Sequence, residues 1–362
     1  MANTLMPTSQ SKTRLLLYGA YGYTGRLTAE LAASKEFDVV LAGRNKDALA
    51  GLGDRLGLPT RVVGLNDATQ LSEALKDIAC VVHMAGPFAA TSAPMLNACL
   101  ATQTNYVDIT GEIEVFEAKW SREDEIRRAE ITVVPGAGFD VVPSDCLAGY
   151  VTSKLERPVS LVIALRGLES ASQGTLRTAI RQVSKPVLCR RAGAIVAIDD
   201  RSPRCIDFGF GDEPCLPVSW GDVATAFHST GVGNITVYLQ RTKLLRSANI
   251  FGKLFGPFLR SRIGQKGLAA IVRSLPEGPT EPERSRHRSL IWAEAVDDQG
   301  RSSKASLSTP NAYDFAANSA LEVASRISSL PAPLGLVTPF QAFGADFVLS
   351  LPGCSRIDIP SS

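Results

Sequence analysis

The chain has 362 residues, of which 45% are hydrophobic and 20% are charged, and its formal net charge at pH 7 is +2. A length beyond that of one ordinary core predicts two domains in a globular protein. The small net charge argues against a nucleic-acid binder held by phosphate contacts alone, and no apolar run approaches the roughly 20 residues that span a bilayer.

The N-terminal residues 1–11 are polar and lack the apolar stretch of a signal peptide, so we expect them to form a disordered tail. The seven cysteines contain no Cys-x-x-Cys pair, and the three histidines are too few for a His-rich zinc site, so we expect no metal. These features are typical of a cytoplasmic protein.

The first predicted element is a buried strand over residues 15–18, which ends at a glycine-rich turn and is followed by a helical pattern. This context predicts a dinucleotide site. Gly19 permits the tight turn, Gly22 removes a side chain that would block a pyrophosphate, and Gly25 lets the helix lie close to the strand. The phosphates would then sit over free N–H groups at the helix N-terminus. The predicted cofactor-binding residues here are Gly19, Ala20, Tyr21, Gly22, Tyr23, Thr24 and Gly25.

The second predicted strand, 39–42, ends at Gly43, Arg44 and Asn45. NAD-binding folds usually place a carboxylate here, which accepts hydrogen bonds from the ribose and would repel a 2′-phosphate. Gly43 leaves room instead, and Arg44 offers a planar cation suited to phosphate. The sequence therefore favours NADP(H) over NAD(H), with Arg44 and Asn45 at the cofactor.

Alternation of strands and helices continues with predicted strands at 61–64 and 79–84, and Asp67 can cap the helix between them. The second of these strands ends where a doubly wound sheet places its next cofactor loop. Small Ala85 and Gly86 would let the dinucleotide approach, and Phe88 can line the nicotinamide site. The predicted cofactor residues of this loop are Ala85, Gly86, Pro87 and Phe88.

Two further strands are predicted at 106–112 and 131–134, followed by a helix that starts near residue 143. Ligands of open α/β sheets bind beyond the carboxyl ends of the strands. This rule places Glu112, Asp140, Ser144 and Cys146 near the chemistry. Capping and turn roles account for Asp140, Ser144 and Asp145 just as well, and we expect structural rather than catalytic roles for these three.

The second half of the chain loses this alternation. A strand is expected at 158–165, a helix at 174–185, antiparallel strands within 194–240, a hairpin from 288–296 and 302–308, and a helix at 312–328. The predicted fold is α/β, a Rossmann-type doubly wound parallel sheet with a second, inserted α+β domain. The Rossmann domain would cover 12–154 and be completed by about 310–362, and the α+β domain would cover 155–309.

The segment 241–275 contains no acidic residue and interleaves lysine and arginine with aromatic and aliphatic side chains. Such a segment can dock an acyl-carrier protein, hold an acyl chain or contact a membrane surface peripherally. It can equally be one or two helices that pack on the sheet with a solvated basic face. Self-association into a homodimer also stays open at this stage.

Five ordered motifs resemble the saccharopine dehydrogenase-like oxidoreductases, and within them the trans-acting enoyl reductases of polyketide-type lipid biosynthesis. They lie at 18–26, 41–45, 85–88, 106–112 and 135–145. Gly174-Thr175 and the segment 335–344 are similar to later parts of that branch. The sequence departs from it at Gln173, where the branch has glycine. The resemblance implies a Rossmann-type NADP domain with an inserted α+β domain.

The leading functional hypothesis is an NADPH-dependent reductase of an α,β-unsaturated acyl thioester. The enolate that forms needs a hydrogen-bond donor and a proton, for which the candidates by residue type are Tyr106, Thr175, Cys146 and Tyr238. A saccharopine-type imine reductase is the second reading, with Arg166, Arg177 and Arg181 as a clamp for carboxylates. The third is a non-catalytic NADP-binding module at lipid surfaces.

Overall fold

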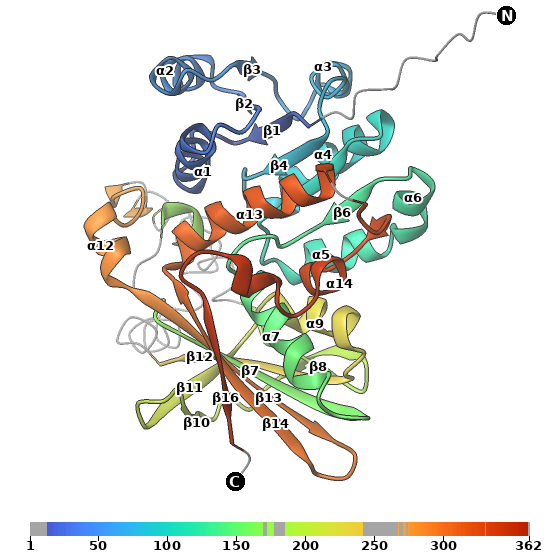
Figure 1. Ribbon diagram of the computed structural model, residues 1–362, viewed down its shortest axis with the longest axis vertical. Coiled ribbons are helices and arrows are strands. Elements are labelled where there is room, and N and C mark those ends of the chain that lie inside the picture. Colours follow the sequence, from blue (N-terminus) through green and yellow to red (C-terminus); the bar gives the residue numbers. More distant parts are fainter. Residues whose placement is uncertain are drawn as a thin grey trace, which may run out of the picture.

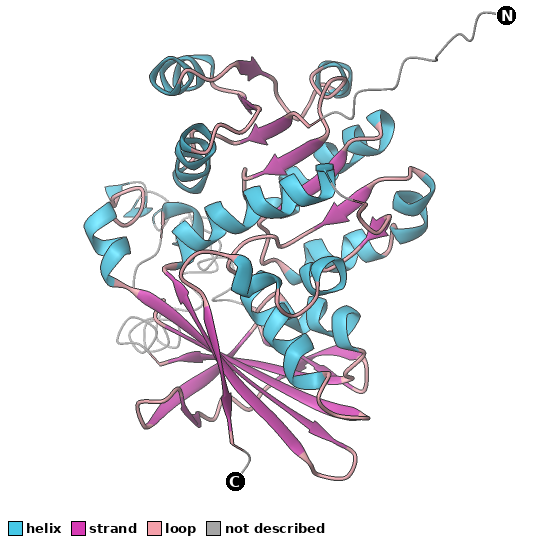
Figure 2. Ribbon diagram, in the orientation of Figure 1, coloured by secondary structure: helices cyan, strands magenta, loops and turns pink. Residues whose placement is uncertain are grey.

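A computed structural model describes residues 13–168, 172–176, 185–241, 267, 271–272, 274–329 and 331–360. The predicted tail 1–11, most of the predicted helix 174–185 and most of the basic segment 241–275 therefore lie outside the described residues. The described chain forms two sheets, each associated with its own helices (Figures 1 and 2).

The first sheet is parallel throughout, and its strand order is that of a Rossmann-type sheet with one added strand. In spatial order its strands are β15 (Gly335–Leu336), β6 (Thr132–Val134), β5 (Asn105–Asp108), β4 (Cys80–His83), β1 (Leu15–Tyr18), β2 (Val39–Gly43) and β3 (Thr60–Val62). The expected doubly wound parallel sheet is confirmed.

Helices cover both faces of this sheet, which is why its central strands read as continuous apolar runs. Leu15 and Leu17 point to one face and Leu16 and Tyr18 to the other. The first face packs against α1 (Tyr23–Ser34), α2 (Lys46–Leu56) and α13 (Ala312–Ser329). The second packs against α3 (Ala68–Glu73), α4 (Phe88–Thr102) and α6 (Glu123–Arg128).

The second sheet is mixed and strongly twisted, and its strands cross in the lower half of Figure 1. In spatial order they are β10 (Arg204–Asp207), β11 (Asp212–Val218), β12 (Asn234–Gln240), β7 (Pro158–Arg166), β13 (Arg288–Asp297), β14 (Ser302–Pro310) and β16 (Ser355–Ile359). The hairpin β8 (Val187–Arg191) and β9 (Ala194–Ile198) is attached through β12.

The predicted hairpin of β13 and β14 is confirmed, because the two strands pair antiparallel over their whole length. Within 194–240, β10, β11 and β12 pair antiparallel in that order and β9 pairs antiparallel with β8, but β12 runs parallel to β7. The C-terminal segment divides between the sheets: α13 and β15 lie on the first, whereas β16 joins the second.

Helix α7 (Val142–Thr152) connects the two sheets, and nearly all its residues are buried. It packs on β13 and β14 and on α9 (Asp222–Thr230), while α5 (Ile113–Trp120) contacts α9 from the first sheet's side. The remaining short elements are α12 (Glu281–Arg286), α14 (Pro339–Phe343) and the 3-10 helix η1 (Phe347–Ser350). One apolar core runs continuously from the first sheet through α7 to the second.

Candidate cofactor and active site

The carboxyl ends of the parallel strands meet at one edge of the first sheet, where the loops after β1, β2, β4, β5 and β6 lie together. Segments from the second half of the chain approach the same edge near residues 172–175, 277–284 and 313. This edge is where open α/β sheets bind their ligands.

The three glycines of the first loop serve different purposes. A Cβ on Gly25 would lie 2.2 Å from the carbonyl oxygen of Gly19, and one on Gly19, whose φ is +84°, would lie 2.9 Å from Ala85. The fold itself therefore requires these two glycines. Gly22 is exposed, and a Cβ there would meet only the Gly19 oxygen at 3.3 Å. Its small size leaves the approach to the helix open from outside.

The N-terminus of α1 differs from those of α2 and α4. Its N-cap residue, Gly22, has no side chain to cap the helix, and its first turn contains no acidic residue. In contrast, Asn45 caps α2 by accepting from Ala48 N, and Glu112 accepts from the Phe88 and Ala89 N–H groups at the start of α4. Free N–H groups at the positive end of α1 form an anion site suited to a pyrophosphate.

Arg44 follows β2 and is exposed, and no described residue forms a hydrogen bond or ion pair with its side chain. Gly43 lies beside it, and a Cβ there would lie 2.6 Å from the Tyr21 ring, so a larger residue would require this ring to move. Asn45, predicted at the cofactor, is engaged in capping α2. Of the predicted pair, Arg44 is thus the residue available to a ligand phosphate.

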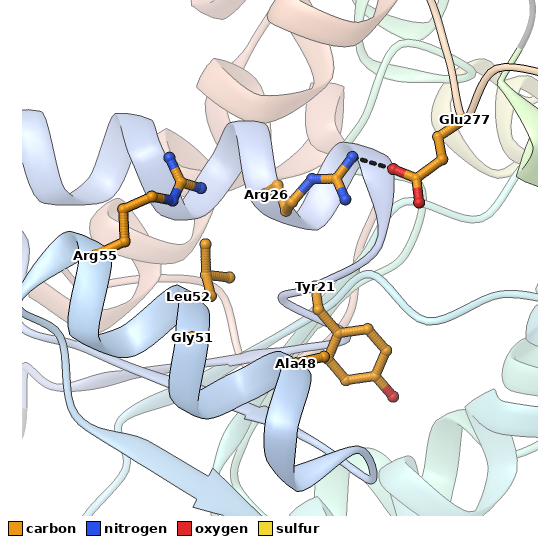
Figure 3. A pocket seen from close by; sticks show the side chains of 7 residues that line it. All are labelled: Tyr21, Arg26, Ala48, Gly51, Leu52, Arg55 and Glu277. Carbon is orange, nitrogen blue, oxygen red and sulfur yellow. Dashed lines mark hydrogen bonds and ion pairs between the residues drawn. The ribbon is translucent and has the colours of Figure 1, made fainter.

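A groove of about 380 Å³ lies between α1 and α2, beside Tyr21 (Figure 3). Its two arginines are already paired, Arg26 with Glu277 and Arg55 with Glu30 at 2.9 Å. These pairs leave the groove without the uncompensated cation that Arg44 provides at the end of β2.

In the loop after β4, three of the four predicted cofactor residues are accessible and the fourth is buried. Gly86 is exposed, and Ala85 and Pro87 are partly exposed. Phe88 is buried and packs edge-on against His83, with ring centroids 5.4 Å apart, so its ring does not line the opening. Burial lowers the pKa of His83 to about 4, so this histidine is a neutral core residue.

The segment 277–284, called the clasp below, packs against the first turn of α1. The Tyr23 hydroxyl donates to the Pro279 carbonyl at 2.5 Å, the Tyr23 ring lies against Gly278, and Arg26 pairs with Glu277. The clasp is anchored by Arg284, which pairs with Asp314 at 2.8 Å and donates to Tyr23 at 3.2 Å. These contacts join the second half of the chain directly to the predicted phosphate loop.

Thr175 lies in this neighbourhood, whereas the other three predicted proton donors do not. The Thr175 hydroxyl is 3.1 Å from that of Tyr313, whose ring packs edge-on against Tyr23 with centroids 5.0 Å apart. Tyr313 also accepts from the Ser172 N–H at 2.5 Å. A hydroxyl cluster formed by Ser172, Thr175 and Tyr313 therefore lies beside the N-terminus of α1.

Tyr106 and Cys146 are fully buried in the core. The Tyr106 hydroxyl donates to Asp108 at 2.7 Å, and Asp108 pairs with the buried Lys119 at 3.0 Å. Burial raises the pKa of Cys146 well above its ordinary value, which keeps it a thiol. Tyr238 packs with Trp292 on the face of the second sheet that points away from α7. The structure brings none of these three to the predicted cofactor site.

Asp140 is the carboxylate that the structure does place at this edge. It follows β6, and the residue as a whole is partly exposed although its carboxyl group is buried; it forms no hydrogen bond or ion pair with another described side chain. Its carboxyl lies against Gly111, where a Cβ would come within 2.4 Å of Oδ2. Burial raises the pKa of Asp140 to about 6, which suits a general acid near neutral pH. The sequence signal was a carboxylate after one strand and a glycine after its neighbour.

Two other carboxylates of this region are sealed inside. Asp145 accepts from Ser229 and, at 2.8 Å, from the Phe340 N–H, and burial raises its pKa to about 6. Asp222 is fully buried beside Ser144 at 2.9 Å, and burial raises its pKa well above the ordinary value. Because neither reaches solvent, both serve the packing of α7 on α9.

Among the described residues, no group of His, Cys, Asp and Glu side chains is arranged to hold a metal ion. Across the same part of the chain, no helix is both long and apolar enough to cross a membrane.

The parallel sheet, the open glycine loop and the uncapped α1 define a Rossmann-type NAD(P)-binding oxidoreductase domain. Residues 15–134 match the saccharopine dehydrogenase NADP-binding domain. The bovine saccharopine dehydrogenase-like oxidoreductase is 24% identical over 189 residues, covering 47% of this chain and 44% of the relative. The trans-acting enoyl reductase of Mycobacterium leprae (strain TN) is 32% identical over 141 residues, covering 36% and 33%. The chain is thus similar to the saccharopine dehydrogenase-like oxidoreductases, and its residues 15–134 carry the match to their NADP-binding domain.

Solved structures agree on the fold. Saccharopine dehydrogenase (L-Glu forming) from Saccharomyces cerevisiae superposes with a TM-score of 0.66 at 12% identity, covering 96% of this chain and 100% of that one. Homospermidine synthase from Legionella pneumophila, solved in complex with NAD, gives a TM-score of 0.64 at 10% identity, covering 96% and 92%. The matched sequence spans about half or less of the length of the curated relatives.

Proposed function

We propose that this protein is an NADPH-dependent reductase of α,β-unsaturated acyl thioesters, of the kind used in lipid or polyketide biosynthesis. The observation that carries the cofactor part is the combination of an uncapped α1 N-terminus with an unpaired Arg44 at the end of β2. The first supports binding of a pyrophosphate, and the second supports preference for a 2′-phosphate.

A bound NADPH supplies the hydride for such a reduction. On the protein side, the first requirement is a dinucleotide held along the strand ends, for which Gly22 and Gly86 leave space. The second is a proton for the α-carbon once the β-carbon has accepted hydride. Protonated Asp140 can supply it, because its carboxyl is raised in pKa and is not engaged with another described side chain.

The thioester is preferred over a polycarboxylate imine for a specific reason. Reduction of such an imine needs arginines that are free to bind the substrate's carboxylates. Arg166 is not free, because its Nε donates to both carboxylate oxygens of Glu213 at 3.0 Å. Arg177 and Arg181 lie outside the described residues. The trans-acting enoyl reductases among the relatives support the same preference.

The test is to incubate the protein with NADPH and either a crotonyl thioester or an imine formed from glutamate and an aldehyde, and to follow the loss of NADPH absorbance. Consumption with the thioester supports the proposal. Consumption only with the imine would move the protein to the saccharopine-type reaction. Tight NADPH binding without consumption by either would favour a non-catalytic cofactor-binding module.

A carrier-bound acyl group is the form of substrate that the basic segment 241–275 suggests. The same assay with thioesters on an acyl-carrier protein and on free coenzyme A addresses this part of the proposal. A higher kcat/KM for the carrier-bound form would support docking, and equal values would remove it.

A further inference from the structure

The second sheet carries a groove on the face that points away from α7. Its volume is about 610 Å³, within the range of small-molecule sites. Residues at alternate positions of β13, β14 and β16 line it, while the intervening Ile291, Ala293 and Leu307 face the main core. The groove therefore shares no residue with the cofactor site described above.

The register of the three strands arranges the lining in rows across the sheet. One row is Glu294, Lys304 and Ile359, the next is Trp292, Ser306 and Ile357, and the last is Leu290, Ser308 and Ser355. Small serines of β14 thus form the floor of a trough, with bulky apolar walls on both sides. Successive rows are two residues apart along each strand, so the three rows extend over roughly 14 Å.

The chain from Arg204 to Phe210 lies over this trough. Arg204 pairs with Glu294 at 2.5 Å, and its guanidinium lies 5.7 Å from the centre of the Trp292 ring. Ile206 and Phe208 pack into the same apolar cluster as Trp292. Apolar surface nevertheless stays open to solvent, because Phe210 is 73% exposed and Ile357 is 66% exposed.

Charge is concentrated at one end of the trough. Glu294 is shared by two cations, Arg204 and Lys304, the latter at 3.1 Å. The other acidic lining residue, Asp207, is engaged by the N–H groups of its own turn, at 2.7 Å for Gly209. The Arg204 and Lys304 end therefore carries one positive charge more than Glu294 balances, and Asp207 is the other charged residue of the lining.

We propose that this groove binds a single-chain anionic amphiphile, an aliphatic chain with a carboxylate or phosphate head. The chain would lie on Ser306 and Ser308 between the Trp292 and Ile357 walls, and the head would lie at Lys304 and Arg204. Burial of the chain provides the affinity, and the cations select the charged head.

The experiment is calorimetric titration of the full chain with dodecanoate and with dodecyl phosphate, below their micelle concentrations, and with dodecanol as the uncharged probe. We expect one site per chain and at least tenfold weaker binding of the alcohol. Comparing the carboxylate with the phosphate shows which head the site prefers.

Ser306→Leu fills the trough and should abolish binding. Ser160→Leu is the matched control. Ser160 lies on the same face of the second sheet as Val162, which packs with Trp292, but it is outside the groove lining. Its substitution should therefore leave binding unchanged. Lys304→Gln should weaken the anionic probes about tenfold and the alcohol little. NADPH affinity and thermal unfolding of each variant establish that it is folded.

Sedimentation of the wild type and of Ser306→Leu distinguishes a second copy of the chain as the occupant. A dimer that Ser306→Leu dissociates, together with no binding of the probes, would overturn the proposal. So would probe binding that survives Ser306→Leu, or no binding by the folded wild-type protein.

Discussion

The two sheets present their functional residues in different ways. In the first, the parallel strands align their carboxyl ends, so that Gly22, Arg44, Gly86 and Asp140 reach one edge although they are far apart in sequence. In the second, most neighbouring strands run antiparallel, so their carboxyl ends lie at opposite edges. Successive side chains along each strand point to alternate faces of the sheet. A residue's position along the chain therefore predicts a site in the first sheet and does not in the second.

The largest expected effect tests the glycine loop. Gly22→Val should reduce NADPH affinity by about a thousandfold or more while the protein stays folded, because the added side chain occupies the approach to α1 and meets little of the protein itself. Fluorescence titration of NADPH measures the affinity, and circular dichroism monitors the fold.

Gly25→Val is the matched control for this prediction. A side chain there collides with the Gly19 carbonyl, so we expect a loss of about 3 kcal/mol or more in the free energy of unfolding. If both variants unfold equally, the distinction between a ligand-facing and a structural glycine is lost.

The next effect concerns the proton donor. Asp140→Asn should lower kcat by about a hundredfold to a thousandfold with little change in NADPH affinity. In the wild type, kcat/KM should fall as pH rises through about 6, because the protonated carboxyl is the active form, and this limb should vanish in the variant. Steady-state kinetics across pH measure both.

Asp145→Asn separates catalysis from burial, because burial raises the pKa of this carboxyl to about 6 as well. Asp145 is buried in α7 and accepts hydrogen bonds from Ser229 of α9 and the Phe340 N–H of α14, so its substitution should lower stability and leave the pH profile in place. A profile altered equally by both substitutions would contradict the role given to Asp140.

Arg44→Ala should weaken NADPH about tenfold to a hundredfold and leave NADH nearly unchanged, because only the 2′-phosphate is expected to contact the guanidinium. Arg55→Ala is the control: Arg55 lies on the neighbouring α2 but is paired with Glu30. Equal losses for the two cofactors in Arg44→Ala would remove the assignment to the 2′-phosphate.

A smaller effect is expected from Asp222, whose raised pKa means that the folded state holds a proton that the unfolded state releases. The free energy of unfolding should therefore fall as pH rises above the ordinary pKa of 3.8, by at most about 1.4 kcal/mol per pH unit. Asp222→Asn cannot ionise, so its stability relative to wild type should improve toward higher pH.

Urea unfolding at several pH values measures this trend, with Asp297→Asn as the control of opposite sign. Hydrogen bonds and the ion pair with Arg301 lower the pKa of Asp297, so its contribution to stability is present above its ordinary pKa and lost at lower pH. Its variant should be more destabilised at high pH than at low pH. The same trend in both variants would contradict the assignment.

The smallest effect is expected on the outer face of the second sheet. Tyr238→Phe should leave kcat and KM unchanged, because Tyr238 packs in the apolar cluster away from α7. Thr175→Val should lower kcat/KM several-fold, because the Thr175 hydroxyl contacts Tyr313 beside α1. A loss of activity in Tyr238→Phe with none in Thr175→Val would place the active site on the outer face of the second sheet and not beside α1.

The sequence alone predicted the parallel sheet and the glycine turn between β1 and α1, because each is signalled by residues close together in the chain, whereas the assignment of Arg44 to a 2′-phosphate stays a prediction. A strand, a turn and a helix within about 20 residues carry their own steric signals, such as the close approach that Gly25 permits. The hairpin of β13 and β14 was predicted for the same reason.

Tertiary structure alone decided which polar groups are accessible. Tyr106, Cys146 and Tyr238 have suitable chemistry, yet burial or strand parity removes them from the site. The carboxyl of Asp140 fits against Gly111 because glycine has no side chain, and the residues that contact Tyr23 are about 250 positions away from it in the chain. Burial and long-range contacts depend on the whole packed chain, so local patterns cannot fix them.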